Sequence, residues 1–140
     1  MEYIDTSIIV ALLAREPAAE RVSAWLREQT PGSLHVSGWT MTEFSSALSL
    51  KLRTGQIDIE QKSTALAAFN RLVSRSLVVL PVASPDFHAA ARLCDRSELG
   101  LRAGDSLHIA IAVRSGLPIV TLDKVMAAAC SAIAHPAQFI

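Results

Sequence analysis

The chain lacks several features that would place it outside the ordinary globular proteins. No apolar stretch reaches the ~18 residues that a membrane-spanning helix needs. The opening residues, MEYID, contain no basic segment followed by an apolar one, so we expect no signal peptide and a cytoplasmic protein. The two cysteines, Cys94 and Cys130, show no CxxC or Cys/His spacing, which argues against a disulfide framework or a zinc site. We expect both to be small core residues.

The chain has a formal net charge of zero, because 13 Lys and Arg residues balance 13 Asp and Glu residues. Bulk electrostatics therefore give no evidence for nucleic-acid binding. Repeats, linkers and low-complexity segments are absent as well. What remains is a chain of 140 residues with 51% hydrophobic residues, which is enough for one domain with a real core. We expect a single domain over residues 1–140.

Short apolar runs alternate with helical patterns along the chain. The runs predict strands at residues 3–5, 34–37, 77–80 and 118–121, with a short fifth strand at 132–134. The run Leu77-Val78-Val79-Leu80 is continuous, which is typical of a strand buried on both faces. Amphipathic or apolar helices are predicted between these strands, and the one from Asp105 to Ser115 is apolar nearly all round. This alternation predicts an α/β fold, in which helices cover both faces of a parallel sheet of four to five strands.

Four acidic residues stand at the ends of these apolar runs: Asp5 in YIDTS, Glu43 in TMTEF, Asp105 in RAGDSLHIAIA and Asp123 in VTLDK. Ligands of open parallel sheets bind outside the carboxyl ends of the strands. Asp5 and Asp123 follow predicted strands, and Glu43 and Asp105 lie near helix starts, so all four can reach one edge. Carboxylates gathered there repel one another unless a cation pairs with them.

A hard divalent cation is the natural counter-charge, because Mg²⁺ and Mn²⁺ prefer oxygen ligands. Such ions lower the pKa of water and neutralise phosphate charge, so metal-dependent cleavage of a phosphodiester is the leading interpretation. We assign Asp5 the central, bridging position, with Glu43 and Asp105 completing the first site. Asp123 then holds or orients a second, weaker ion. The sequence does not decide between one metal ion and two.

Each of the four acids also has a purely structural interpretation. Asp5 and Asp105 suit helix N-caps, Glu43 suits the positive end of a helix dipole, and Asp123 suits a turn. Capping and metal binding are compatible for Asp5. His108 lies one helical turn after Asp105, and on so apolar a helix we interpret it as a satisfied core or groove histidine rather than a ligand or base.

The ordered motifs YIDTS, TEF, GDSLHIAIA and IVTLD resemble those of the PIN domain family of nucleases, over essentially the whole chain. Within that family the chain is similar to the VapC-type toxins of bacterial toxin–antitoxin pairs. The resemblance implies a three-layer α/β/α fold and an Mg²⁺- or Mn²⁺-dependent endoribonuclease. It also implies an RNA substrate, a cognate antitoxin that occupies the active-site groove, and a homodimer. It places Asp5, Glu43, Asp105 and Asp123 in the family's acidic cluster, with Thr6 or Ser7 helping to order the metal site.

Two other classes of protein gather carboxylates at strand ends. A haloacid-dehalogenase-like enzyme needs a second Asp two residues after the first, but Ser7 stands there after Asp5. A receiver domain needs an acidic pair after the first strand, and Asp5 stands alone. The remaining alternative is a non-catalytic PIN-like module that binds RNA or serves as a scaffold. For the antitoxin, the resemblance places the groove between the first helix and the region 57–75. We expect the exposed members of Ile8, Leu12, Leu66 and Phe69 to contact an amphipathic peptide there.

Overall fold

A computed structural model describes all residues of the chain, 1–140. The strands are β1 (Glu2–Ile4), β2 (Leu34–Ser37), β3 (Leu77–Leu80), β4 (Ile119–Thr121) and β5 (Ala137–Phe139). The helices are α1 (Thr6–Leu13), α2 (Ala19–Arg27), α3 (Gly38–Arg53), α4 (Ile59–Ser76), α5 (Ser84–Asp95), α6 (Ala103–Ser115) and α7 (Lys124–Ala132), with a short 3₁₀ helix at Ser97–Leu99. The predicted alternation of strands and helices is confirmed.

The five strands form one parallel sheet in the order β3-β2-β1-β4-β5. β1 lies at its centre, and its residue Tyr3 pairs with His35 of β2 and with Ile119 of β4. In a parallel sheet the carboxyl ends of all strands meet at one edge. The residues that directly follow β1, β2 and β4 therefore gather there.

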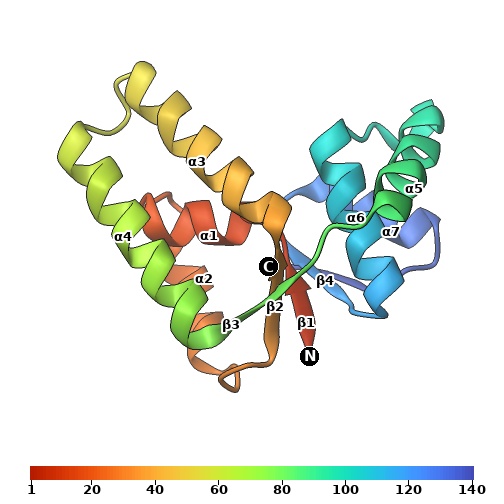
Figure 1. Cartoon of the computed structure of the whole chain (residues 1–140), viewed down its shortest axis with the longest axis horizontal. Helices are drawn as coiled ribbons and strands as arrows, with labels where there is room; N and C mark the ends of the chain where they lie inside the picture. The colour runs from red at the N-terminus through yellow and green to blue at the C-terminus, as the bar shows by residue number, and fades with distance from the viewer.

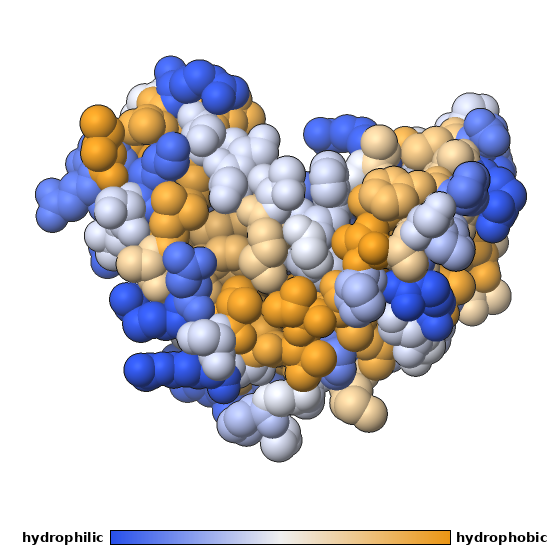
Figure 2. All heavy atoms as spheres, in the orientation of Figure 1, coloured by the Kyte–Doolittle hydropathy of each residue, from blue (hydrophilic) through white to orange (hydrophobic).

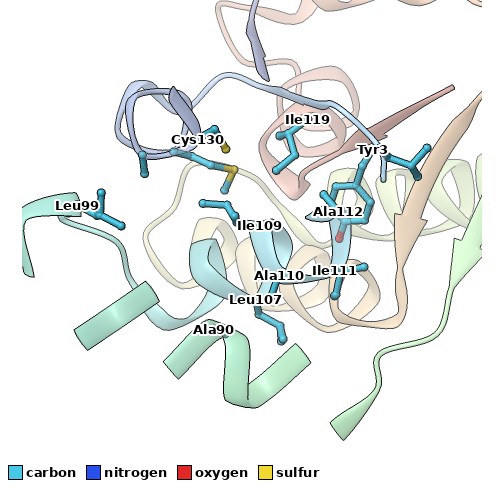
Figure 3. Close-up of a cluster of buried hydrophobic side chains, with 13 residues drawn as sticks. Tyr3, Ala90, Leu99, Leu107, Ile109, Ala110, Ile111, Ala112, Ile119 and Cys130 are labelled. Atoms are coloured by element: carbon cyan, nitrogen blue, oxygen red, sulfur yellow. The ribbon is translucent and has the colours of Figure 1, made fainter. Parts of the chain in front are cut away.

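Helices cover both faces of the sheet, and the two cores follow from strand alternation. Successive strand residues point to opposite faces. Tyr3 and Ile119 face a core built with α5, α6 and α7 (Figure 3), whereas Ile4 and Val120 face a second core built with α1 to α4. Figure 1 shows the resulting arrangement, with the sheet between the α1–α4 layer and the α5–α7 layer. The three-layer α/β/α fold is confirmed.

Helix α6 is the most deeply buried helix of the second layer. Every residue from Ser106 to Ala112 is buried, including the polar side chains of Ser106 and His108. The helix begins at Ala103, two residues before the predicted start, so Asp105 lies inside its first turn. Gly116 ends it with a φ of 64°, a left-handed conformation that glycine adopts without a steric penalty.

Two predictions about the strands are wrong. β3 is an edge strand rather than a strand buried on both faces, and Val78 and Val79 remain 39% and 44% exposed. Figure 2 shows apolar surface gathered over this edge of the sheet. An apolar run alone does not tell whether a second neighbouring strand exists. The fifth strand lies at Ala137–Phe139 rather than at 132–134, because α7 continues to Ala132 and a turn follows.

Between the two helical layers the surface is hollowed by a notch (Figure 2). Strand β1 points toward this notch in Figure 1, and α3 and α6 lie on its two sides. The fold therefore brings the ends of the central strands and the first turns of two helices from opposite layers to the same region. No helix in the structure is both long and apolar enough to cross a membrane.

Candidate metal and active site

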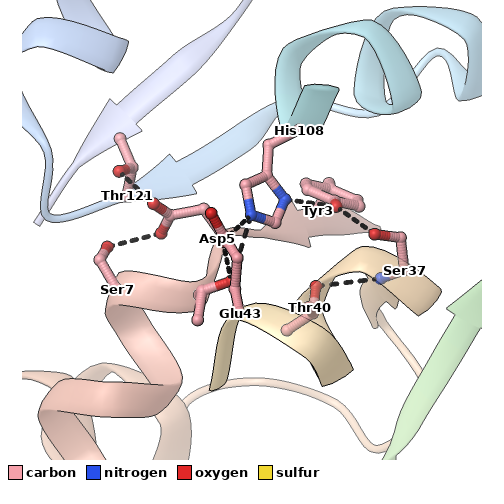
Figure 4. Close-up of polar contacts among 9 residues, drawn as sticks. Tyr3, Asp5, Ser7, Ser37, Thr40, Glu43, His108 and Thr121 are labelled. Atoms are coloured by element: carbon pink, nitrogen blue, oxygen red, sulfur yellow. Dashed lines mark hydrogen bonds and ion pairs between the residues drawn. The ribbon is translucent and has the colours of Figure 1, made fainter. Parts of the chain in front are cut away.

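Asp5 lies directly after β1 and is 4% exposed. Its backbone amide donates to the carbonyl of Val120 at 3.3 Å, which places the residue at the edge of the sheet beside β4. The hydroxyl of Ser7 donates to Oδ1 at 2.6 Å, and the hydroxyl of Thr121 donates to Oδ2 at 3.1 Å. Both carboxylate oxygens are therefore oriented by neutral donors (Figure 4).

The two hydroxyls that orient Asp5 are themselves fixed by the backbone after β4. The amide of Leu122 donates to Ser7 Oγ at 3.0 Å, and the amide of Asp123 donates to Thr121 Oγ1 at 2.9 Å. Burial raises the pKa of Asp5 to about 6, and the positive charge of His108 and the two hydroxyls only partly offset this effect. The site thus holds a carboxylate whose negative charge is poorly compensated by the protein.

Glu43 comes from the second turn of α3, and its side chain is 28% exposed. Its Oε2 lies 2.6 Å from Nε2 of His108 and accepts a hydrogen bond from the Thr6 hydroxyl at 2.5 Å. Burial alone would raise the pKa of Glu43, but its hydrogen bonds and the charge of His108 outweigh burial and lower it. In contrast to Asp5, Glu43 has a partner that can carry a positive charge.

The other oxygen of Glu43, Oε1, lies against the backbone of Gly104 in the first turn of α6. A side chain at position 104 would overlap Oε1, and it would also come within 3.4 Å of the indole nitrogen of Trp39. The missing side chain of Gly104 is thus what allows the Glu43 carboxylate from α3 to approach α6 so closely.

Asp105 and Asp123 are held at helix starts by backbone groups. Oδ2 of Asp105 accepts from the amide of Arg102 at 3.1 Å, and Oδ1 of Asp123 accepts from the amides of Val125 and Met126 at 2.7 and 3.1 Å. Asp123 is thus the N-cap of α7 rather than the turn residue of the purely structural interpretation. Burial, and then the negative charges of Asp123 and Glu43, raise the pKa of Asp105 despite its hydrogen bond to Arg102. Asp123 and Glu43 therefore each lie within electrostatic reach of Asp105.

The structure brings the four acids to one region but not into one cage. Glu43 shares a hydrogen-bonded group with Thr6 and His108, and Asp5 lies next to this group (Figure 4). No three Asp, Glu, His or Cys residues are arranged closely enough to hold one metal ion as they stand. The chemistry of these side chains nevertheless suits a hard cation, because all four are carboxylates and Mg²⁺ and Mn²⁺ prefer oxygen ligands.

Sequence reasoning underestimated His108 and missed Thr121. His108 is 1% exposed, as expected for a core histidine, but it also contacts Glu43 directly. Its spacing of one turn from Asp105 was the available signal. Thr121 donates to Asp5, and its position two residues before Asp123 in IVTLD was the only hint. Thr6 and Ser7, for which the resemblance implies a supporting role, donate hydrogen bonds to Glu43 and Asp5, and that role at a metal site stays a prediction.

An ion pair joins helix α6 to helix α5. Arg114 and Asp86 form this pair, with Nε 2.6 Å from Oδ1; Asp86 is only 1% exposed, whereas the side chain of Arg114 is 37% exposed. The guanidinium of Arg114 is therefore engaged by Asp86 and by the carbonyl of Pro81. Cys94 is exposed rather than part of the core, whereas Cys130 is buried as expected.

The chain belongs to the PIN domain family, whose family model matches residues 3–131. Among solved structures, the chain is similar to VapC20 of Mycobacterium tuberculosis, a sarcin–ricin-loop-cleaving toxin. The identity is 20% and the TM-score 0.73, over 92% of this chain and 95% of that one. FitAcB from Neisseria gonorrhoeae is 21% identical with a TM-score of 0.70, over 100% and 97%.

A third similar structure is a toxin–antitoxin complex from Klebsiella pneumoniae. It is 16% identical, with a TM-score of 0.67 over 91% of each chain. The comparison with curated protein sequences gives no match. At these identities the likeness of the solved structures concerns the fold, and the predicted membership in the PIN domain family is confirmed by the family model.

Proposed function

We propose that this chain is the toxin component of a toxin–antitoxin pair and acts as an Mg²⁺- or Mn²⁺-dependent endoribonuclease. The observation that carries the proposal is Asp5. It is a buried carboxylate at the carboxyl end of the central strand, with neutral hydrogen-bond partners and three further acids nearby. A structural carboxylate so deeply buried would normally be paired with a cationic side chain.

The cation would be held by Asp5, Glu43, Asp105 and Asp123. When bound, a divalent ion supplies a water molecule of lowered pKa and neutralises charge on the phosphate. Ser7 and Thr121 keep both oxygens of Asp5 in fixed directions, so this carboxylate needs little reorganisation to bind a cation. Thr6 and His108 hold one oxygen of Glu43, Oε2. None of these residues has to serve as a separate general base.

An RNA substrate is supported by the PIN fold and by the similarity to VapC20, a sarcin–ricin-loop-cleaving toxin. Glu43 lies on α3, one of the two helices beside the notch, and its side chain is 28% exposed, which leaves room for a phosphodiester to approach it. The alternative is a non-catalytic PIN-like module that binds RNA or serves as a scaffold. The presence of all four acids favours the enzyme over that alternative.

An antitoxin partner is supported by the solved toxin–antitoxin complex with the same fold. Of the residues expected to contact it, Ile8 and Phe69 are fully buried in the core and are unable to do so. Leu12 and Leu66 are only partly buried and remain candidates. A cavity of about 360 Å³ between the end of α1 and α4, lined by Leu13, Ile57 and Thr64 among others, lies in the same region. An arginine of the antitoxin that reaches the acids would replace the charge of the metal ion.

We also propose that the protein is a homodimer, because the resemblance of its sequence to VapC-type toxins implies one. Light scattering coupled to size-exclusion chromatography tests this directly, because a dimer has twice the 15.0 kDa mass of the chain. A mass equal to that of one chain at micromolar concentration contradicts it.

The experiment that tests the enzyme activity uses purified protein free of antitoxin and total cellular RNA. The protein is incubated with Mg²⁺ or Mn²⁺, with EDTA, and as the Asp5→Asn variant, and new 5′ ends are mapped by sequencing. Discrete cuts that need both metal and Asp5 support the nuclease and identify its substrate. A folded protein that retains RNA without cutting it under any of these conditions supports the scaffold alternative.

A further inference from the structure

His108 connects two polar groups that come from opposite layers of the fold. It projects from α6, where it is 1% exposed, toward Glu43 on α3. Its Nε2 lies 2.6 Å from Glu43 Oε2 and 3.1 Å from Thr6 Oγ1. Since an ionised carboxylate only accepts hydrogen bonds, Nε2 carries the proton in the contact with Glu43. The result is a direct bond between the two helices that border the notch.

The other ring nitrogen of His108 is anchored in the core. Nδ1 lies 2.7 Å from the hydroxyl of Tyr3, which in turn donates to Ser37 Oγ at 2.9 Å. Tyr3 and Ser37 are both fully buried, and they belong to the neighbouring strands β1 and β2. Because both ring nitrogens make hydrogen bonds, the imidazole is held against rotation about its Cβ–Cγ bond. Figure 4 shows this line of contacts from Ser37 through Tyr3 and His108 to Glu43.

Glu43 needs such a partner more than the other acids do. Asp5, Asp105 and Asp123 follow strands or start helices, and hydroxyls or backbone amides within three residues in the sequence hold at least one oxygen of each. Glu43 lies in the second turn of α3, on a longer and more flexible side chain, and the protein groups that hold its Oε2 are Thr6 and His108. One helix, α6, thus supplies both Asp105 and the residue that fixes Glu43.

We propose that His108 is a positioning residue that, anchored by Tyr3, holds the Glu43 carboxylate in place for binding of a divalent cation. This inference depends on the proposed function, in which Glu43 is a metal ligand. His108 itself touches neither metal nor substrate. Groups that orient a metal ligand in this way typically change metal affinity by about 10- to 100-fold when removed.

Two substitutions separate the two nitrogens of His108. The side-chain amide of glutamine reaches about the position of Nε2, whereas that of asparagine reaches only about the position of Nδ1. His108→Gln should therefore retain the bond to Glu43, and His108→Asn should retain the bond to Tyr3 but lose Glu43. We expect Mn²⁺ affinity, measured by calorimetry on the metal-free protein, to fall by about 10-fold or more in His108→Asn. It should fall less in His108→Gln, which keeps the contact with Glu43 and loses only the anchor at Tyr3.

The double variant Glu43→Gln, His108→Asn tests whether the effect passes through Glu43. If it does, Mn²⁺ affinity in the double variant equals that of Glu43→Gln alone, since nothing remains to be positioned. If the two losses multiply, His108 acts by another route and the inference is wrong. Equal Mn²⁺ affinities of wild type, His108→Gln and His108→Asn overturn it as well.

A merely structural histidine would give a different pattern. It would change the melting temperature of both variants without a selective loss of Mn²⁺ affinity in His108→Asn. If His108→Asn does not fold, Tyr3→Phe serves instead, because it removes the anchor of Nδ1 and leaves the contact of Nε2 with Glu43. We expect Tyr3→Phe to weaken Mn²⁺ binding, and an unchanged affinity contradicts the anchoring role.

Failure of the inference is distinguishable from failure of the proposed function. If wild-type protein neither binds Mn²⁺ nor cuts RNA, the proposed function fails and the positioning role fails with it. If wild type binds Mn²⁺ and cuts RNA but His108→Asn binds Mn²⁺ equally well, only the positioning role is wrong.

Discussion

Asp5 and Asp86 are the two most deeply buried carboxylates of this protein, with 4% and 1% exposure, yet their surroundings differ. Asp86 accepts two hydrogen bonds from the guanidinium of Arg114 and one from the amide of Ala83. These contacts lower its pKa although burial acts in the opposite direction. Asp5 accepts hydrogen bonds from two neutral hydroxyls, and burial raises its pKa to about 6.

This difference shows where the chain itself supplies a cationic partner for a buried carboxylate and where it does not. Between α5 and α6 the buried negative charge is matched by a cationic side chain of the same chain. At the end of β1 the charge is oriented but not matched. Glu43 lies between these extremes, because His108 and Thr6 lower its pKa. The place where the protein leaves a buried charge unmatched is the place where an external cation is proposed to bind.

The largest expected effect comes from Asp5→Asn. Loss of its charge removes the central proposed ligand, so RNA cleavage should fall by at least about 10²- to 10³-fold, as when a key charge-stabilising group is removed. Growth arrest on expression without antitoxin should disappear, measured as colony counts after induction. Asp86→Asn is the matched control, in which a buried aspartate outside the site is changed in the same way. A growth arrest that survives Asp5→Asn contradicts the catalytic assignment.

The pH dependence of stability should show the unmatched charge of Asp5 directly. The pKa of Asp5 is raised in the folded state, so protonated Asp5 contributes to the stability of the metal-free protein. This contribution is complete below about pH 4 and is lost as the pH rises through about 6. A shift from 3.8 to about 6 corresponds to about 3 kcal/mol in the free energy of unfolding. The free energy of unfolding of Asp5→Asn, measured by urea denaturation, should exceed that of wild type at pH 7. Near pH 4 the two values should be similar.

Mn²⁺ sharpens this measurement. Because a cation that binds only the folded state stabilises it, Mn²⁺ should raise the stability of wild type at pH 7 and not that of Asp5→Asn. A difference between the two proteins that does not vary between pH 4 and pH 7 contradicts the raised pKa. A Mn²⁺ effect of the same size in both proteins argues against Asp5 as a ligand.

Arg114→Ala breaks the matched pair and should behave in the opposite way. It leaves the buried carboxylate of Asp86 with the single hydrogen bond from Ala83, so we expect a loss of about 1–3 kcal/mol in the free energy of unfolding. Cleavage of RNA well below the melting temperature should not change. A raised KM for RNA with unchanged stability would instead show that Arg114 contacts the substrate.

The smallest expected effect comes from Gly104→Ala. The added methyl group overlaps Glu43 Oε1, so the carboxylate has to move away from its position beside α6. We expect Mn²⁺ affinity to fall by about 10-fold or less. Alanine favours the helix by up to about 1 kcal/mol relative to glycine, so stability should not fall in parallel. Calorimetry with Mn²⁺ and thermal unfolding of the same preparation separate the two effects.

Local patterns in the sequence were enough for the fold class and for the placement of the four acids near one edge of the sheet, while their role as metal ligands stays a prediction. Each acid stands beside an apolar strand or in an early turn of a helix, and a parallel sheet carries all such positions to one edge. The same reasoning failed for β3, because an apolar run such as Leu77-Val78-Val79-Leu80 is compatible with both an edge strand and a central strand. An amphipathic pattern also did not decide which of the four residues expected near the antitoxin are exposed, and the structure shows that Ile8 and Phe69 are buried.

By itself, then, the sequence determined which residues carry charge and at which edge of the sheet they lie, because those properties depend on short-range periodicity. Only the tertiary structure decided the partner of each charge. Thr121 is 116 residues from Asp5, and His108 is 65 residues from Glu43. Nothing local predicts such contacts, because they arise when helices from opposite faces of the sheet meet at its edge. They make Asp5 an unmatched charge and Glu43 a matched one.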